Sequence, residues 1–310
     1  MKVLALSGGV GGAKLALGLS RVLSAEELVI VANTADDFEH LGLHIAPDLD
    51  TVMYTLAGLN DTSRGWGLAD ESWQCMTAME TLGGESWFRL GDMDLATHLQ
   101  RSSLMRAGHS LTATTAQLCR ALGVDTPVVP MSDDPVRTLV MTEEGELPFQ
   151  HYFVREQCRP RVAGFRFDGI EAASPQPELM SLLADDALSL IVICPSNPFV
   201  SVDPILQLPG VRSAMAESQA PVLAVSPIVA GTALKGPAAK MLDELGLPVS
   251  AESVARHYEG LVNTFVLDES DATLAPVIQG LGMDVEVAPT IMVSLEDREQ
   301  LARRVLSLTR

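Results

Sequence analysis

Cysteine, positive charge and long hydrophobic runs are all scarce in this 310-residue sequence, and each shortage excludes a class of protein. The four cysteines stand far apart without paired spacing, which suggests neither a zinc site nor a disulfide framework. With 21 Lys and Arg against 40 Asp and Glu, the formal net charge is -19, so a nucleic-acid backbone would be repelled over most of the surface. A small anionic ligand can still bind through local cations and backbone amides.

No run of about 18 apolar residues appears, and the amino terminus enters a predicted strand without a signal-peptide core. We therefore expect a soluble protein of the reducing cytoplasm, with neither a membrane nor a nucleic acid as a partner. The apolar content of 47% is enough to bury a large core. One large α/β domain that carries an insertion fits this length better than several small domains.

A glycine-rich loop joins the first predicted strand to the first predicted helix. Residues 7–14 read SGGVGGAK, between the apolar run KVLAL and LALGLSRVL. Glycines permit positive φ and close approach of a ligand, and the amides that open a helix attract an anion, most often a phosphate. Neither the dinucleotide fingerprint nor the P-loop fits, because Lys14 and Leu15 stand where those motifs require other residues. A turn with glycines for packing alone is the other interpretation. The candidate anion-binding residues are Gly8, Gly9, Gly11, Gly12 and Lys14.

Polar residues follow the second predicted strand. Residues 27–33 (ELVIVAN) are typical of a buried parallel strand, and NTADD begins at its carboxyl end, where ligands bind in open α/β sheets. Asn33, Thr34 and Asp36 are therefore candidate ligand contacts. Asp36 and Asp37 together suggest a ribose contact or magnesium, and capping of the next turn is the alternative.

The segment IAPDLDT at residues 45–51 precedes residues with helical spacing, so Asp48 or Asp50 lies at or near a helix start. A carboxylate there is stabilised by the helix dipole. It can cap the helix, hold a metal or accept a proton from a substrate hydroxyl.

The pattern between residues 61 and 123 predicts a helical insertion, with amphipathic stretches at 95–108 and 110–123. Trp87, Phe88 and Arg89 lie together in it, close to two aspartates. Aromatic rings beside an arginine could cover a flat heteroaromatic ligand, although tryptophans that bridge two subdomains explain the pattern equally well.

Two other groups of polar residues are interpreted as structural. His98 and His109 fall in predicted helices without a third ligand at metal-site spacing. Four arginines between Arg155 and Arg166 could reach a phosphate, but a solvated edge is the preferred interpretation.

The second half of the chain restarts the sheet pattern. Asn197 follows one predicted strand, and Ser226 and Lys235 follow the next, so these residues form a second candidate anion cradle on the same sheet edge. The predicted strands are 127–131, 189–194, 221–225, 261–267 and 285–287, with a hairpin over 136–154 and a final amphipathic helix over 294–310.

The sequence resembles the 2-phospho-L-lactate transferase family, whose members add the phosphorylated acid arm to a deazariboflavin in coenzyme F-420 biosynthesis. The resemblance covers nearly the whole chain in matching order. It rests on SGGVGGAK at 7–14, NTADD at 33–37, PDLDT at 47–51, WFRLGDMDLATH at 87–98, CPSNPFVSVDPIL at 194–206 and SPIVAGTALKGPA at 226–238.

This resemblance implies an α/β fold with a Rossmann-like three-layer core and a mostly parallel sheet. Residues 1–60 and 124–310 would form the nucleotide-binding core, and the helical insertion at 61–123 would contribute to the acceptor site. The resemblance also implies a guanosine diphosphate-linked donor, Mg²⁺ and the acceptor 7,8-didemethyl-8-hydroxy-5-deazariboflavin, here called the deazaflavin. Positions that match Asp50 and Arg89 contact the deazaflavin in this family.

In the implied reaction, the terminal ribityl hydroxyl attacks the phosphorus that bears the acid, and guanosine monophosphate (GMP) leaves. Such a displacement requires positioning and charge neutralisation more than a covalent nucleophile. We expect Asp50 to orient the hydroxyl, hold magnesium, or do both, with Asp36 as a second magnesium ligand. Arg89, Trp87 and Phe88 would hold the acceptor. The donor would contact Gly8, Gly9, Gly11, Gly12, Lys14, Asn33, Thr34, Asp36, Asn197, Ser226 and Lys235.

Two other classes remain open. A sugar-nucleotide-binding regulator of the same superfamily would keep the glycine loop but need no acceptor pocket, and a nicotinamide-dependent dehydrogenase would need a cleaner fingerprint. The sequence leaves open whether the transferred group is phospholactyl, phosphoenolpyruvyl or phosphoglyceryl, because these groups differ by only a few pocket contacts. A homodimer is compatible with the sequence, which does not fix the oligomeric state.

Overall fold

The computed structural model describes residues 1–309, and its centre is a seven-stranded sheet in the order β14-β13-β10-β9-β1-β2-β5. Every neighbouring pair in this sheet is parallel. The predicted α/β class is therefore confirmed, and each predicted core strand is present within a few residues. The strands are β1 (Lys2–Ser7), β2 (Leu28–Ala32), β5 (Val128–Pro130), β9 (Leu188–Ile193), β10 (Val222–Val225), β13 (Thr264–Leu267) and β14 (Asp284–Val287).

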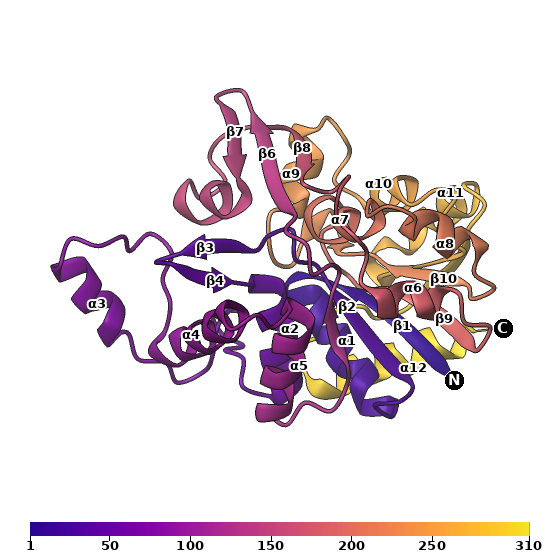
Figure 1. The fold of residues 1–310 in the computed structure, drawn as a ribbon. Helices are drawn as coiled ribbons and strands as arrows, with labels where there is room; N and C mark the ends of the chain where they lie inside the picture. The colour runs from indigo at the N-terminus through magenta and orange to yellow at the C-terminus, as the bar shows by residue number, and fades with distance from the viewer. Residues whose placement is uncertain (310) are drawn as a thin grey trace.

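Helices cover both faces of this sheet, which makes three layers (Figure 1). Side chains alternate along a strand, so Val3 and Ala5 of β1 enter one apolar core while Leu4 and Leu6 enter the other. The first core includes side chains from α1 (Gly9–Val22), α2 (Pro47–Ala57), α5 (Leu111–Ala121) and α12 (Leu295–Ser307). The second includes α6 (Pro177–Leu183), α7 (Asp203–Leu206), α8 (Val211–Glu217), α9 (Ala238–Glu244), α10 (Ala251–His257) and α11 (Ala275–Gln279).

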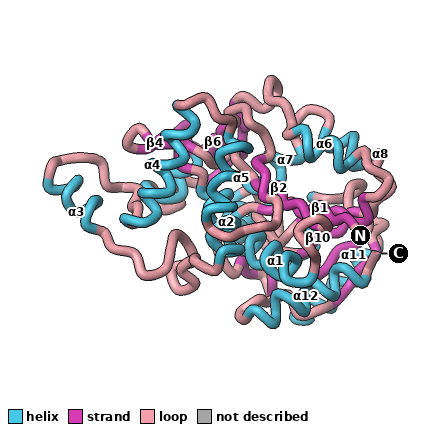
Figure 2. Tube along the Cα trace, turned by 60° about the horizontal axis from the view of Figure 1, so that its bottom comes forward, coloured by secondary structure: helices cyan, strands magenta, loops and turns pink. Residues whose placement is uncertain are grey.

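Two smaller units extend from the three layers. The first contains the hairpin β3 (Phe38–His40) and β4 (Leu43–Ile45) with α3 (Gln74–Thr81) and α4 (Asp92–Arg106). Helix α3 projects furthest from the sheet in both ribbon views (Figures 1 and 2). Helices α3, α4 and α5 all fall within residues 61–123, and α5 also packs into the core of the sheet. The division of the chain into domains stays a prediction.

The second unit is an antiparallel sheet in the order β7-β6-β8. Strands β6 (Arg137–Thr142) and β7 (Gly145–Pro148) form the predicted hairpin, with Thr142 opposite Gly145. The expected second strand ends early, because residues His151–Arg155 form a helical turn, η1. Strand β8 (Val162–Asp168), which the sequence pattern did not predict, pairs with β6. It places Arg166 in exposed ion pairs with Glu146 and Asp168, in keeping with a solvated edge.

The order of the strands fixes where a ligand can bind. From β1 the chain continues to β2 and β5 on one side, and later returns to place β9 and β10 on the other. The carboxyl ends of β1 and β9 therefore flank a topological switch point, where a crevice opens above the sheet. The helical turn η2 (Pro198–Val202) follows β9 and borders this crevice, and a second turn, η3 (Glu269–Leu274), follows β13.

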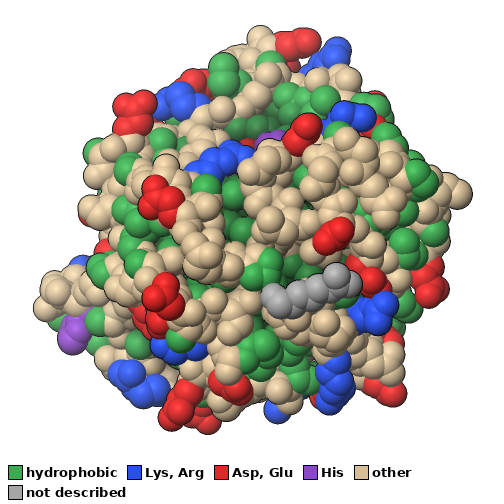
Figure 3. Space-filling model, turned by 90° about the vertical axis from the view of Figure 1, so that its right-hand side faces the viewer, with side chains coloured by type: hydrophobic (Ala, Val, Ile, Leu, Met, Phe, Trp, Pro, Cys, Tyr) green, Lys and Arg blue, Asp and Glu red, His purple; other side chains and the backbone are tan. Residues whose placement is uncertain are grey.

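Acidic and basic side chains are interspersed among apolar and neutral atoms on the face shown in Figure 3. Within residues 1–309, no helix is both long and apolar enough to cross a membrane.

Candidate active site

The glycine loop meets the loop after β9 at the switch point. The backbone amide of Gly8 donates to Ser196 Oγ at 3.0 Å. A Cβ on Gly11 would lie 2.2 Å from the carbonyl oxygen of Pro195, so this glycine is required by the packing of α1 against that loop. Gly9 has a φ of +62° with open space beside it, a left-handed conformation that favours glycine at the start of α1.

The amide of Gly9 donates to a buried carboxylate. Asp48 Oδ1 accepts this hydrogen bond at 2.7 Å, and its Oδ2 accepts another from Asn33 Nδ2 at 3.0 Å. Asn33 also donates to the carbonyl of Val200 at 3.2 Å. The first turn of α2 is thereby tied to the glycine loop, to the end of β2 and to η2, which fixes the position of the Asp48 side chain.

Asp36 and Asp48 together bring negative charge to the crevice. Burial raises the pKa of Asp36 well above its usual value, and the nearby charge of Asp48 raises it further. Burial also raises the pKa of Asp48 to about 6, although hydrogen bonds from Asn33 and Gly9 act to lower it. Among residues 1–309, Oδ1 of Asp36 has no hydrogen-bond partner. A bound cation would therefore relieve the electrostatic cost of this pair.

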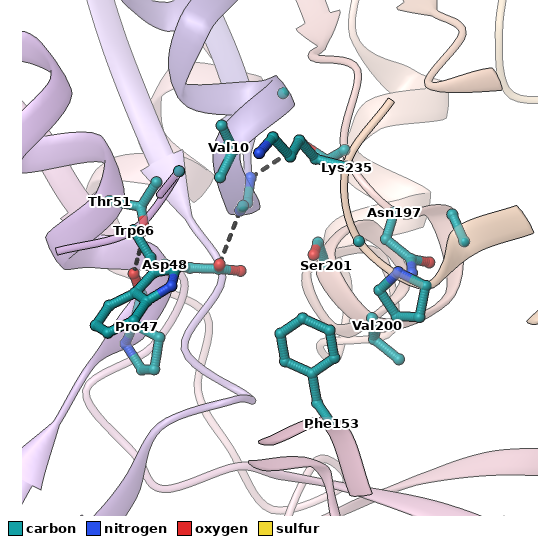
Figure 4. A pocket seen from close by; sticks show the side chains of 18 of the residues that line it. Val10, Pro47, Asp48, Thr51, Trp66, Phe153, Asn197, Val200, Ser201 and Lys235 are labelled. Carbon is teal, nitrogen blue, oxygen red and sulfur yellow. Dashed lines mark hydrogen bonds between the residues drawn. The ribbon is translucent and has the colours of Figure 1, made fainter. Parts of the chain in front are cut away.

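These groups line a cavity of about 610 Å³, a usual size for a small-molecule site. Figure 4 shows Asp48, Thr51 and Trp66 on one wall, facing Asn197, Ser201 and Val200 on the other. The predicted residues that line it are Gly8, Gly9, Gly11, Lys14, Asp36, Trp87, Phe88, Arg89, Asn197, Ser226 and Lys235.

Lysines lie at the glycine-loop end of the cavity. Lys14 Nζ donates to the backbone carbonyl of Met292 at 2.8 Å, and burial lowers its pKa, with smaller contributions from Arg298 and Lys235. Lys235 follows the short antiparallel pair β11 (Ile228–Val229) and β12 (Thr232–Ala233), and a Cβ on Gly65 would lie 3.2 Å from its Nζ. Two cations and the first amides of α1 thus make this end suited to a phosphorylated ligand.

Some predicted donor contacts support the cavity without lining it. Asn33 and Thr34 are buried outside the lining, and Asn33 acts through Asp48. Gly12 is packed so closely that a Cβ would lie 2.4 Å from Ser196 Oγ. Ser226 does line the cavity, and its hydroxyl donates to the carbonyl of Ile228 at 2.8 Å, which shapes the loop that carries Lys235.

Aromatic rings and arginines form the other end of the cavity. The guanidinium of Arg89 lies 5.0 Å from the ring centre of Trp73, and that of Arg64 lies 5.1 Å from the same ring. Trp73 therefore holds both cations through cation–π contacts. Trp87 packs edge-on against Phe88 at 5.7 Å. This end offers flat apolar surfaces beside positive charge, an arrangement suited to a heteroaromatic ligand.

The aspartates near Arg89 are engaged elsewhere. Asp92 accepts hydrogen bonds from Ser72 Oγ and from the amides of Gln74 and Cys75, so it caps α3. Asp94 Oδ1 accepts from the hydroxyl of Tyr54 at 2.7 Å. Arg89 is therefore left to face the cavity.

Asp50 is placed differently from Asp48. It is 4% exposed, and both of its oxygens accept hydrogen bonds from the guanidinium of Arg101, which is 1% exposed. Asp50 lines a smaller pocket of about 80 Å³ behind the aromatic end, together with Arg89. The expectation that Asp50 is the base or a metal ligand stays a prediction, while its contact with this buried arginine is plain.

Asp36 and Asp48 fit the expected magnesium site better than Asp36 and Asp50 do. Within the described part of the chain, no group of three or more His, Cys, Asp or Glu side chains is arranged to hold a metal ion by itself. Mg²⁺ commonly takes one or two carboxylates and completes its shell with water and substrate phosphates. Asp36 and Asp48 supply two carboxylates at the wall of the main cavity, whereas Asp50 is paired with the buried cation of Arg101 and lines the smaller pocket.

Sequence reasoning missed several cavity residues. Gln150 and Phe153 line the cavity from η1 and the segment before it, and Ser201 lines it from η2. No motif marks them, because their approach depends on how the antiparallel sheet and η2 pack over the crevice. Arg64 and Trp66 also line it. Their only signal was the glycine- and tryptophan-rich stretch SRGWGLADESW at residues 63–73.

The fold and cavity define an α/β protein of the doubly wound type, with a glycine loop and a carboxylate pair at its switch point. A family profile described as 2-phospho-L-lactate transferase CofD matches residues 3–303. The chain belongs to this transferase family, and it is an enzyme of the transferase type.

Relatives with two different names match over nearly the full length. A 2-phospho-L-lactate transferase of Methanosarcina acetivorans is 39% identical and is matched over 98% of this chain and 97% of its own. A phosphoenolpyruvate transferase of Kitasatospora aureofaciens is 38% identical over 99% and 98%. A crystal structure of a UPF0052-family protein from Bacillus halodurans has a TM-score of 0.62 at 14% identity, with 98% of each chain covered, and it supports the fold alone.

Proposed function

We propose that this enzyme transfers a phosphorylated three-carbon acid from a guanosine diphosphate-linked donor to the ribityl hydroxyl of the deazaflavin, with release of GMP, in coenzyme F-420 biosynthesis. The observation that carries the proposal is one continuous cavity with two chemically different ends. Lysines and helix amides lie at one end, aromatic rings and arginines lie at the other, and Asp48 lies on the wall of the same cavity. The names of the relatives support transfer of a phosphoacid.

The donor would bind with its diphosphate at the glycine loop. The first-turn amides of Val10 and Gly11, together with Lys14 and Lys235, would neutralise its oxygens, because the amide of Gly9 already donates to Asp48. Its bridging oxygen would then lie near Asp48, which is hydrogen-bonded to that same loop.

Mg²⁺, when bound, would neutralise the charge that develops on the diphosphate during displacement. Asp36 and Asp48 would hold it, because their carboxylates line the cavity and burial raises the pKa of both. These two residues take the place that the sequence suggested for Asp36 and Asp50.

The acceptor would place its ring between Trp66, Phe88 and Arg89, with the ribityl chain directed toward Asp48. The terminal hydroxyl oxygen would form a bond to the phosphorus that carries the acid, and the bond from that phosphorus to the GMP oxygen would break. The hydroxyl proton would pass to the Asp48 carboxylate, directly or through water. No covalent enzyme intermediate is required.

The aromatic end of the cavity also favours a transferase over a sugar-nucleotide-binding regulator. A sugar-nucleotide-binding regulator has no use for a second ligand site joined to the first, and the relatives are named as transferases. A dehydrogenase is disfavoured by the same names and by the lysine in the glycine loop.

Incubation with the deazaflavin, magnesium and each guanylylated acid tests the proposal. Mass spectrometry should show one acid transferred to the deazaflavin, and its mass identifies the phospholactyl, phosphoenolpyruvyl or phosphoglyceryl group. Samples without enzyme or without magnesium are the controls. An unmodified deazaflavin with all three donors would contradict the proposed function.

A further inference from the structure

A small pocket opens behind the aromatic end of the cavity, between α2 and α4. Its volume is about 80 Å³, and Trp66, Phe88 and Arg89 line both this pocket and the main cavity. Because a water molecule occupies about 30 Å³ of liquid, the pocket has room for only a few non-hydrogen atoms. It can receive the edge of a ring whose body remains in the main cavity.

His98 lines this pocket with a donor that has no partner. The side chain is 2% exposed, and within residues 1–309 its Nε2 makes no hydrogen bond. Asp94 Oδ1 lies 3.4 Å from Nε2 but outside hydrogen-bond geometry, and it accepts from the hydroxyl of Tyr54. A buried polar atom without a partner is uncommon and indicates a group that a ligand can satisfy.

The neighbours of His98 determine which of its nitrogens carries the proton. Its Nδ1 lies 3.0 Å from a guanidinium nitrogen of Arg101, which can only donate. Nδ1 must therefore accept, and the proton of the neutral ring resides on Nε2. Arg101 is itself fixed by its two hydrogen bonds to Asp50, so it fixes the orientation of the His98 imidazole in turn. The pocket thus presents one oriented N–H donor.

We propose that His98 is a specificity-determining residue that donates a hydrogen bond from Nε2 to the ring hydroxyl oxygen of the acceptor. This inference rests on the proposed function, because it takes the deazaflavin as the acceptor. A hydroxyl on the ring edge fits a pocket of this size, and Arg89 at the pocket wall favours partial negative charge on its oxygen. A flavin with methyl groups at that edge would leave the N–H of His98 unpaired, a loss that strongly disfavours such analogues.

The comparison of two acceptors tests this role. Isothermal calorimetry measures the binding of the deazaflavin and of 5-deazariboflavin, which carries methyl groups at the same ring edge, to the parent protein and to variants. We expect the parent to bind the hydroxylated ring at least tenfold more tightly. His98→Leu should remove most of that preference by weakening the hydroxylated acceptor alone, with guanosine diphosphate affinity within about twofold of the parent.

Two variants control for damage to the fold. His98→Gln keeps an oxygen that can accept from Arg101 and an amide that can donate, so it should retain part of the preference. His109→Leu is the same type of change at an exposed loop residue and should leave both affinities unchanged. Melting temperatures of all variants show whether the loss is specific.

Each outcome decides a different question. Equal weakening of both acceptors by His98→Leu, or equal affinity of the parent for both, would overturn the role of His98. The same holds if the preference survives in His98→Leu. A parent that binds neither acceptor would instead refute the proposed function itself.

Discussion

Replacing Asp50 by asparagine should show whether the Asp50 carboxylate is structural or catalytic. The change preserves volume but removes the charge that faces Arg101. That guanidinium is 1% exposed and relies on Asp50 for two hydrogen bonds, and its Nε has no partner among residues 1–309. An asparagine can accept only one of those bonds, and its amide nitrogen would face a donor.

The expected cost follows from this geometry. Breaking a buried ion pair at one partner costs about 3–5 kcal/mol of unfolding free energy, because the remaining charge is left without compensation. For a protein of this size, the melting temperature should fall by on the order of 10 °C. Asp48→Asn removes a carboxylate whose pKa is already raised to about 6 by burial, so the loss of stability should be much smaller.

The same two variants should differ in the opposite sense in catalysis. Asp48→Asn should reduce turnover by roughly a hundredfold or more through the loss of a proton acceptor and cation ligand. Asp50→Asn, assayed below its melting temperature, should retain considerably more activity. Calorimetric melting curves and initial rates on both variants provide the measurements. An Asp50→Asn protein with parental melting temperature and abolished turnover would refute this assignment and restore Asp50 as the catalytic residue.

Three further predictions concern the donor loop, the acceptor end and the cation. Gly11→Val should lower the melting temperature and weaken both ligands in calorimetry, because its Cβ would lie 2.2 Å from the Pro195 carbonyl; selective loss of guanosine diphosphate binding would contradict this. Arg89→Ala should raise KM for the deazaflavin by about tenfold with little change in guanosine diphosphate affinity, and Arg89→Lys should raise KM less. A destabilised Arg89→Ala protein with unaltered acceptor kinetics would exclude Arg89 from the site. Burial raises the pKa of Asp36 and Asp48, so protonation should weaken cation binding as the pH falls through about 6. Added Mg²⁺ should therefore raise the melting temperature more at pH 7.5 than at pH 5. The Asp48→Asn variant should show a smaller rise than the parent.

The core strands were predictable because buried parallel strands appear in sequence as short apolar runs. The run at residues 189–194 corresponds to β9 at Leu188–Ile193. Strand β8 was missed because its burial alternates weakly and arginine interrupts it. Strands β3 and β4 are three residues each and carry too little periodicity to recognise.

The candidate site likewise contains residues that could be predicted from the sequence and residues that could not. The glycine loop, Lys14 and Asp36 could be assigned from local motifs, since SGGVGGAK and NTADD each begin at the end of a predicted strand. The choice between Asp48 and Asp50 could not, because both begin the same helix and only tertiary packing sets Arg101 against one of them. Phe153 likewise reaches the cavity through packing that no short pattern encodes.

The stoichiometry of GMP release tests the central claim most directly. Quenched single-turnover reactions with enzyme, magnesium and the guanylylated acid that serves as substrate should be followed with and without the deazaflavin, counting GMP and modified deazaflavin in the same sample. If one cavity joins donor and acceptor, GMP should form only with the deazaflavin present, one molecule for each deazaflavin modified. GMP formed at the same rate without the deazaflavin, or released while the deazaflavin stays unmodified, would contradict it.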